Sequence, residues 1–284
     1  MAHVLDFHQP LADRAIVIVG GTTGLGLSAA KACVRAGASV VVMGRSAESV
    51  QQASEVLSAI GEAVALQGDA CEAGSAERAI ALCVEMFGRF DGLYHVAGGS
   101  GRRFGDGPLH DVTDKGIEAT VSLNLSSMIR SNRAAVRAWR CGGAGRSPSG
   151  AVLNMGSVLG VSPSPRHFAT HVYAATKSAV IGLTRSCAAY YAADNIRFNV
   201  IAPALVETPM AQRAATDPTI QAFVSRKQPL DGGRVGQPED LDAAVVYLLG
   251  AGAACVTGQV LCVDGGWCVS EGLSAEAAVE GGQR

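Results

Sequence analysis

Short apolar runs alternate with longer stretches of helical composition along most of this 284-residue chain. The apolar runs have the length of buried parallel strands and lie near 15–20, 38–43, 63–67, 91–96, 150–155, 195–201 and 259–263. The helical stretches fall between them, near 24–36, 46–59, 73–87, 111–139, 172–192 and 238–249. This alternation predicts an α/β fold, in which a doubly wound, seven-stranded parallel sheet carries helices on both faces.

The chain shows no internal repeat and no linker that would divide it, so we expect one domain over 1–284 with its core at 15–267. Three irregular stretches interrupt the pattern, at 98–107, 141–150 and 207–233. The first is rich in glycine, and we expect it to be mobile. The last residues, 270–284, are small and polar and predict a flexible tail.

A glycine-rich turn joins the first predicted strand to the first predicted helix. It reads Gly20-Gly21-Thr22-Thr23-Gly24-Leu25-Gly26, with the spacing GxxxGxG. A strand, a glycine turn and a helix form a site for a dinucleotide, because the backbone can approach the pyrophosphate and the helix N-terminus favours an anion. A plain turn could also use these glycines, but the flanking elements favour the nucleotide site.

Tyr173 and Lys177 lie four residues apart within the helical stretch 172–192, which places both side chains on one helix face. The positive charge of the lysine should lower the pKa of the phenol towards the working pH. A tyrosine of that kind can give a proton to a carbonyl or take one from an alcohol. Taken alone, the pair could equally be an ordinary solvated helix face.

Composition excludes several other classes. A net charge of −2 and a pI near 6.3 give no electrostatic basis for nucleic-acid binding. No apolar run has membrane-spanning length, and the N-terminus lacks a secretory pattern, so we expect a cytoplasmic protein without a membrane partner. The eight cysteines form no CxxC pair or evident zinc spacing, so we expect reduced thiols and no metal.

With these residues in order along the chain, the sequence resembles the short-chain dehydrogenase/reductase family, in its single-domain branch, and is similar to 3-oxoacyl-carrier-protein reductases. The resemblance runs from about Ala15 to Trp267 and implies the strand order 3-2-1-4-5-6-7. Its motifs after the glycine turn are Asp69, Ala97-Gly98, Asn124, Ser157, Tyr173, Lys177, Pro203, Thr208 and Val263-Asp264-Gly265-Gly266.

The resemblance implies roles for these residues. Tyr173 would be the general acid, Lys177 would lower its pKa and hold the nicotinamide ribose, and Ser157 would bond the carbonyl oxygen. Asn124 would support a water that links Lys177 to solvent. The implied cofactor-binding residues are Gly20, Thr22, Thr23, Gly24, Leu25, Gly26, Arg45, Ser46, Asp69, Ala70, Ala97, Gly98, Tyr173, Lys177, Pro203, Val206 and Thr208.

The second predicted strand ends in Gly44-Arg45-Ser46, where an NAD enzyme usually carries a carboxylate for the ribose hydroxyls. A guanidinium there can bind a 2′-phosphate, so we expect NADP(H), although Arg45 could also be a surface residue and NAD(H) remains possible. The expected activity is hydride transfer between nicotinamide and a carbonyl or secondary alcohol. The alternatives are an NAD-dependent sugar or steroid alcohol dehydrogenase and a dinucleotide-sensing protein without turnover.

Four positions depart from the family pattern, at Val19, His95-Val96, Gly156 and Ala204. The first two remove hydrogen bonds that tie strands together, which puts local stability in doubt. The resemblance further implies a homodimer or homotetramer formed through the helices of Asn124 and Tyr173. Arginines at 102, 103 and 166, from two loops, could converge on an anionic substrate group or could be solvated charges.

Overall fold

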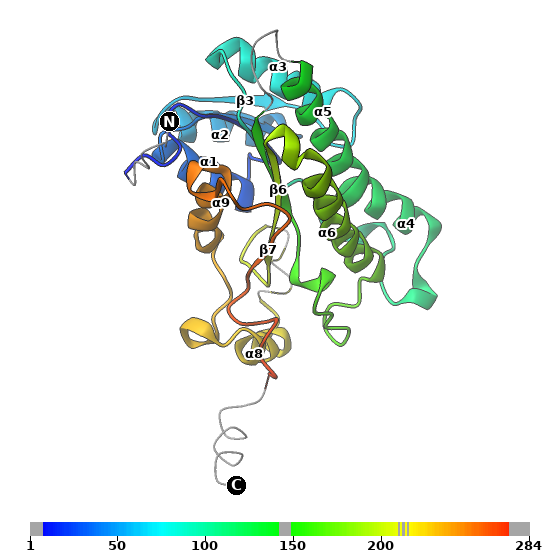
Figure 1. Ribbon diagram of the computed structural model, residues 1–284. Helices are drawn as coiled ribbons and strands as arrows, with labels where there is room; N and C mark the ends of the chain where they lie inside the picture. The colour runs from blue at the N-terminus through cyan, green and yellow to red at the C-terminus, as the bar shows by residue number, and fades with distance from the viewer. Residues whose placement is uncertain (1–7, 142–148, 210, 212–213, 215, 273–284) are drawn as a thin grey trace.

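The computed structural model describes residues 8–141, 149–209, 211, 214 and 216–272, and its strands form one parallel sheet (Figure 1). The order across the sheet is β3-β2-β1-β4-β5-β6-β7, which confirms the expected seven-stranded topology. The strands are β1 (Ala15–Val19), β2 (Ser39–Gly44), β3 (Ala63–Gln67), β4 (Gly92–His95), β5 (Gly150–Met155), β6 (Ile196–Pro203) and β7 (Val260–Val263).

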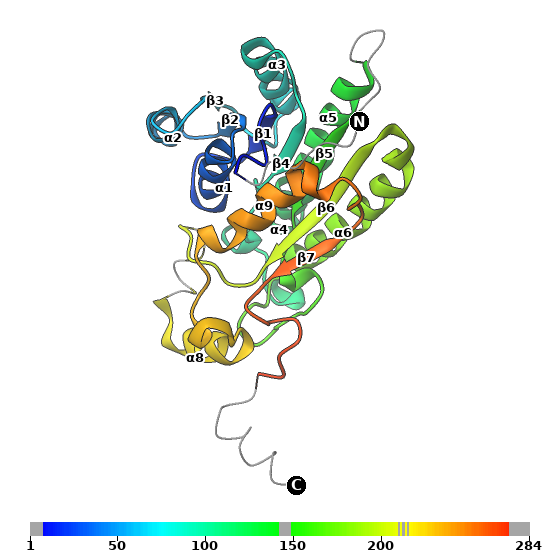
Figure 2. The ribbon, with the colours of Figure 1, turned by 60° about the vertical axis from the view of Figure 1, so that its left-hand side comes forward.

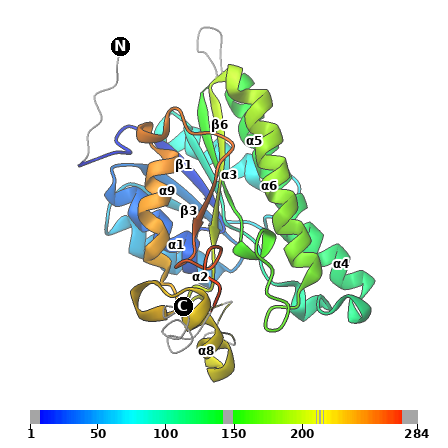
Figure 3. The same cartoon turned by 60° about the horizontal axis from the view of Figure 1, so that its bottom comes forward.

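Helices cover both faces of the sheet, as the alternating pattern predicted (Figure 2). One face carries α1 (Gly24–Arg35), α2 (Ala47–Ser58) and α9 (Asp242–Leu249). The other carries α3 (Ser75–Phe87), α5 (Ser127–Cys141) and α6 (His171–Tyr191), and α4 (Asp114–Val121) packs beside α6. A further helix, α8 (Pro218–Lys227), lies beyond the edge of the sheet at which the strands end (Figure 3).

The central strand β1 divides the core into two layers. Its five residues are all buried, and alternate side chains enter opposite layers because successive residues of a strand face opposite sides. Ile16 and Ile18 pack with α1 and α9, whereas Ala15, Val17 and Val19 pack with α3 and α5. This burial on both sides is why the strand reads as an uninterrupted apolar run.

The stretch 111–139, expected as one helix, is divided into several pieces. A 3₁₀ turn covers Leu109–Asp111, and α4 follows with Thr113 as its N-cap, whose hydroxyl accepts a hydrogen bond from Gly116 N at 3.0 Å. A π-helix at Ser122–Ser126 separates α4 from α5. Such a turn is uncommon within helices and is often found at functional sites.

The segment after β6, which the sequence predicted as irregular, contains a helix. Asp217 caps α8, since its Oδ1 accepts hydrogen bonds from Thr219 N at 2.9 Å and Ile220 N at 3.2 Å, and Pro218 occupies the first turn. Ile220 and Val224 then pack with the fully buried Trp267. The expected connection at 142–148 and the tail at 273–284 lie outside the described residues.

None of the helices in the part of the chain that the structure describes combines the length and the apolar character needed to cross a bilayer.

A carboxylate is partly buried between α1 and α9. Ser28 Oγ donates to Asp242 Oδ2 at 3.0 Å, while Asp242 Oδ1 is buried without a hydrogen-bond partner among the described residues. Burial raises the pKa of Asp242 from its usual 3.8 to about 6. The ionised carboxylate therefore destabilises the folded state at neutral pH.

We predict that Asp242→Asn stabilises the protein in a pH-dependent way. Because the folded pKa is raised, the cost of ionisation is absent below about pH 4, grows as pH rises towards 6 and is complete above it. Since the group is half-exposed, we expect a gain of about 1 kcal/mol at pH 8 and none at pH 4. Urea unfolding at both pH values measures it, with the exposed Asp111→Asn as control. An equal gain at both would contradict this explanation.

Candidate active site

The stretches that the sequence singled out all come together at the edge where the strands end. The glycine turn follows β1, Arg45 follows β2, and Asp69 and Ala70 lie just after β3. Ala97 and Gly98 follow β4, Ser157 follows β5, and the segment from Pro203 to Thr208 begins at the end of β6. In a parallel sheet this is one side of the molecule, where ligands of such folds bind.

The glycine turn is packed too tightly for larger side chains. Gly20 has a φ of 86°, and a Cβ there would lie 2.6 Å from Ala97 N. A Cβ on Gly26 would come within 2.0 Å of Gly20 O. At the N-terminus of α1 the first turn holds no acidic residue, and the Thr23 side chain makes no capping bond. The turn therefore leaves the positive end of the helix to an external anion and fits a dinucleotide phosphate.

Tyr173 and Lys177 share one face of α6, as predicted, and Ser157 faces them from the end of β5. The Ser157 side chain lies close enough to the Tyr173 phenol for a hydrogen bond between them to affect the pKa of the phenol. Lys177 is only 2 % exposed, and its Nζ donates to Met155 O at 2.8 Å and lies 5.5 Å from the Tyr173 ring centroid. A phenol, a hydroxyl and an amine thus form one contiguous polar group.

The prediction that the pKa of Tyr173 is lowered is wrong for the protein without a cofactor. Burial raises the pKa of Tyr173, and the hydrogen bond with Ser157 opposes this only in part. The amine is affected instead, because burial lowers the pKa of Lys177 from 10.5 to about 8. The phenol is thus held as a protonated donor beside an amine that titrates close to neutral pH.

Asn124 lies in the π-helix and is fully buried. Its Nδ2 donates to Gly99 O at 2.9 Å and to Thr120 O at 3.0 Å, and its Oδ1 accepts from Gly99 N at 2.9 Å. A Cβ on Gly98 would lie 2.8 Å from Asn124 Oδ1 and 3.5 Å from Lys177 Nζ, so only glycine fits between them. The amide thereby joins the end of β4 to the helices that flank the site.

Comparison with known proteins agrees with this arrangement. A family model described as enoyl-(acyl carrier protein) reductase matches residues 19–268. The chain is 33 % identical over 262 residues to 2-(S)-hydroxypropyl-CoM dehydrogenase 3 of Xanthobacter autotrophicus, covering 90 % of this chain and 97 % of that one. It is 32 % identical over 269 residues to L-rhamnose 1-dehydrogenase (NAD(P)(+)) of Azotobacter vinelandii, covering 92 % and 98 %.

Among solved structures, a short-chain type dehydrogenase/reductase from Mycobacterium ulcerans superimposes with a TM-score of 0.83 at 29 % identity, covering 95 % of each chain. The chain belongs to the short-chain dehydrogenase/reductase family. It is therefore an oxidoreductase that acts on alcohols or carbonyls with a nicotinamide cofactor.

The departure from the family pattern at His95 is compensated within the structure. His95 is fully buried, with its Nε2 at 3.1 Å from Ala97 O and its Nδ1 at 2.7 Å from Ser131 Oγ. Both ring nitrogens therefore have polar partners within the protein. Burial, followed by the charge of Lys177, lowers the pKa of His95 to about 3, so the ring stays neutral and ties β4 to α5.

A second departure from the short-chain dehydrogenase/reductase pattern, Gly156, follows from close packing. A Cβ at this position would lie 2.6 Å from Val200 Cγ1 of the neighbouring strand β6. Gly156 N also donates to Ile201 O at 2.7 Å, which continues the pairing of β5 with β6 up to Ser157. The glycine therefore brings the end of β5 close to β6 just before the site residue.

Asp106 is a site residue that the sequence did not reveal. It lies in the loop 98–107 and is 5 % exposed, and its two carboxylate oxygens accept hydrogen bonds from Val172 N at 3.1 Å and Tyr173 N at 2.9 Å. A negative charge at a helix N-terminus stabilises the helix. Because the partners are 66 and 67 residues away, no local spacing could have indicated this cap.

The same loop contains local structure. It forms a 3₁₀ turn at Gly101–Phe104, and Arg102 Nη2 donates to His167 O at 3.5 Å, so the two loops expected at the substrate mouth do meet. The guanidinium of Arg103 lies 4.5 Å from the Phe104 ring centroid. Phe168 packs on Trp267 instead, with ring centroids 5.8 Å apart.

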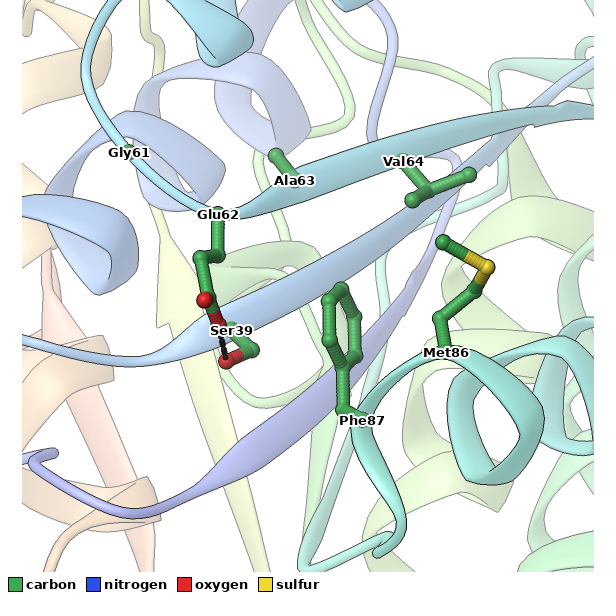
Figure 4. A pocket seen from close by; sticks show the side chains of 7 residues that line it. All are labelled: Ser39, Gly61, Glu62, Ala63, Val64, Met86 and Phe87. Carbon is green, nitrogen blue, oxygen red and sulfur yellow. Dashed lines mark hydrogen bonds between the residues drawn. The ribbon is translucent and has the colours of Figure 1, made fainter.

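A cavity of about 540 Å³ lies elsewhere, at the start of β2 and β3 beside the end of α3 (Figure 4). Its polar lining includes Ser39 and Glu62, whose side chains bond to each other at 2.7 Å. This is the opposite end of the sheet from Tyr173, so the cavity is separate from the active site of this short-chain dehydrogenase/reductase.

We predict that Asp106→Ala lowers kcat about tenfold while changing the KM for the cofactor little, because the first turn of α6 loses its cap and Tyr173 moves relative to Ser157. Asp106→Asn keeps an acceptor and should lose less. Steady-state kinetics, with the exposed Asp111→Ala as control, measures the effect. A lower melting temperature with unchanged kcat would reduce Asp106 to a structural cap.

Proposed function

We propose that this enzyme reduces a carbonyl to a secondary alcohol, or catalyses the reverse reaction, with NADP(H) as its preferred cofactor. The observation that carries the proposal is the placement of Ser157 and Tyr173 with the buried Lys177, at the strand ends that also carry the glycine turn. The one-domain organisation of the chain and its cytoplasmic location remain predictions.

In this proposal Ser157 and Tyr173 hold the substrate oxygen. Both hydroxyls can donate to a carbonyl oxygen, which stabilises the negative charge that develops there during reduction. Tyr173 then transfers its phenolic proton to that oxygen as the general acid, and in oxidation it accepts the proton from the alcohol. The nicotinamide, when bound, supplies or accepts the hydride.

Lys177 would act on the side chain of Tyr173 after proton transfer. With a pKa of about 8 and its Nζ held by Met155 O, the ammonium stabilises the phenolate that Tyr173 becomes and can return a proton to it. Asn124 would act as a positioning residue, because its side-chain amide is hydrogen-bonded to Gly99 and Thr120. Its proposed role is to hold the end of β4 next to Lys177.

The preference for NADP(H) is supported at the end of β2. A Cβ on Gly44 would lie 2.1 Å from Thr22 Oγ1, so the position at which other family members carry a carboxylate cannot hold a side chain here. Arg45 follows and is exposed, and its guanidinium forms no ion pair with a carboxylate among the described residues. Arg45 with Ser46 and Thr23 would bind the 2′-phosphate.

The remaining contacts follow the edge of the sheet. The phosphates would lie on the glycine turn, the adenine beside Asp69 and Ala70, and the nicotinamide between Ala97-Gly98 and the segment Pro203, Val206 and Thr208. Thr208 Cγ2 lies 3.5 Å from the position of a Cβ on Gly24, so this segment does reach the glycine turn. This contact supports closure of the segment over a cofactor.

Assembly into a homodimer or homotetramer is part of the proposal. A groove of about 720 Å³ runs along α5 and α6, lined by Ile129, Val136 and Leu183 among others. The small residues Ala175 and Gly182 on α6 are exposed, and a Cβ on Gly182 would meet nothing within 4 Å. They are therefore open to a second copy of the chain, as close helix packing between subunits requires.

We predict that Tyr173→Phe abolishes turnover and leaves cofactor binding intact, since the change removes only the transferable proton. The loss should be at least ~10²-fold. Oxidation of NADPH is measured against a panel of ketones, 3-oxoacyl thioesters, sugars and steroids, and fluorescence titration gives cofactor affinity. Turnover that survives in the variant would refute the assignment, and cofactor binding without turnover in the wild type would indicate a sensing protein.

We also predict that Arg45→Ala weakens NADPH binding about tenfold or more and leaves NADH binding nearly unchanged. The lost contact is a charge-assisted hydrogen bond worth about 1.5–3 kcal/mol. Titration with both cofactors measures the change, and Arg35→Ala, exposed at the far end of α1, serves as the matched control. Equal losses for both cofactors would favour the NAD-dependent alternative.

A further inference from the structure

Two cysteines, which the sequence predicted only as reduced thiols without a metal, meet at the end of β7. Gly265 and Gly266 have φ values of 60° and 96°, which turn the chain back on itself. Asp264 stabilises the turn, because its Oδ1 accepts from Gly266 N at 2.9 Å and its Oδ2 from Cys268 N at 2.8 Å. The turn brings Cys268 Sγ to 3.9 Å from Cys262 Sγ.

The three side chains have the spacing of metal ligands. Both sulfurs and a carboxylate oxygen of Asp264 lie within 4.8 Å of one another. Two thiolates on a tetrahedral zinc ion, with bonds of about 2.3 Å, are separated by about 3.8 Å. The distance of 3.9 Å between the sulfurs already matches that value. The hydrogen bonds from the backbone fix the orientation of the carboxylate, as outer contacts do in metal sites.

A disulfide fits the same pair less well. The sulfurs would have to approach each other by about 2 Å to form a bond of normal length. All three residues are partly exposed, which leaves a path for an ion from solvent.

We propose that Cys262, Asp264 and Cys268 bind one thiophilic divalent cation of the Zn²⁺ class. Two S–H bonds break and their protons pass to solvent, two sulfur–metal bonds form, and no electrons are transferred. The carboxylate supplies the third bond and water the fourth. Two thiolates and a carboxylate select a borderline-soft ion such as Zn²⁺ over Mg²⁺ or Ca²⁺, which prefer sites made of oxygen ligands alone.

The cation would stiffen one wall of the active site. Trp267 lies within the chelating turn and is 1 % exposed. Its ring centroid is 5.8 Å from that of Phe168 and 5.5 Å from that of Phe223, and its Nε1 donates to Ser162 O at 3.3 Å. Phe168 and Ser162 belong to the loop between Ser157 and Tyr173, so binding should also change Trp267 fluorescence.

The test is direct titration of the full-length protein. After treatment with EDTA, equilibrium dialysis against Zn²⁺ should show one bound ion per chain, and Cys262→Ser and Cys268→Ser should each weaken binding at least tenfold. Cys255→Ser is the matched control, since Cys255 is exposed and lies outside the cluster. Cd²⁺ should give thiolate charge-transfer absorption that both cluster variants lose. Undiminished binding in these variants would overturn the proposal.

A second measurement needs no variant, in case the serine substitutions unfold the turn. Zn²⁺ should protect Cys262 and Cys268 of the wild type from alkylation, as mapped by mass spectrometry, while Cys255 stays reactive and EDTA restores labelling of the pair. Equal labelling of Cys262 and Cys268 with and without Zn²⁺ would contradict the proposal. A mass lower by two hydrogens after isolation without reductant would identify a disulfide instead. Neither measurement depends on turnover, so a negative result would count against the cation site and not against the proposed oxidoreductase activity.

Discussion

Lys177 brings an amine into the interior at the point where β4, β5 and α6 meet, and the geometry of the site depends on how that amine is held. Its hydrogen bond to Met155 O fixes α6 against the end of β5, and Gly98 leaves the room that it occupies. An amine in that position is costly, and burial lowers its pKa to about 8. The cost is acceptable where a neighbouring phenol must gain and lose a proton near neutral pH.

Three polar contacts then fix the elements around this amine. Asn124 joins the π-helix to Gly99, His95 joins β4 to α5, and Asp106 caps the first turn of α6. All three side chains are buried, so each contact excludes water, and losing a partner would leave a buried polar group unsatisfied. Asp106 thereby fixes the backbone of Tyr173, while Asn124 and His95 fix the end of β4 on the side of Lys177, which suits a reaction that requires accurate placement of one proton.

The outer wall of the site is built differently. It consists of α8, the loop 162–168 and the turn after β7, which pack through aromatic rings on Trp267. Gln228 also joins this region to the end of β6, because its Oε1 accepts from Leu205 N at 3.3 Å and its Nε2 donates to Arg234 O at 2.8 Å. The inner site is thus set by the ends of the strands, whereas the outer wall is set by packing around Trp267.

The amino-acid sequence by itself determined the order and type of the elements, because buried parallel strands and helices have different apolar periods. It also placed Tyr173 beside Lys177, since residues four apart share a helix face. Only the tertiary structure decided the contacts between distant segments, such as Asp106 with Tyr173 and Cys262 with Cys268. It also decided the direction of the pKa shift at Tyr173, because burial outweighs the opposing effect of Ser157 and depends on everything packed around the residue.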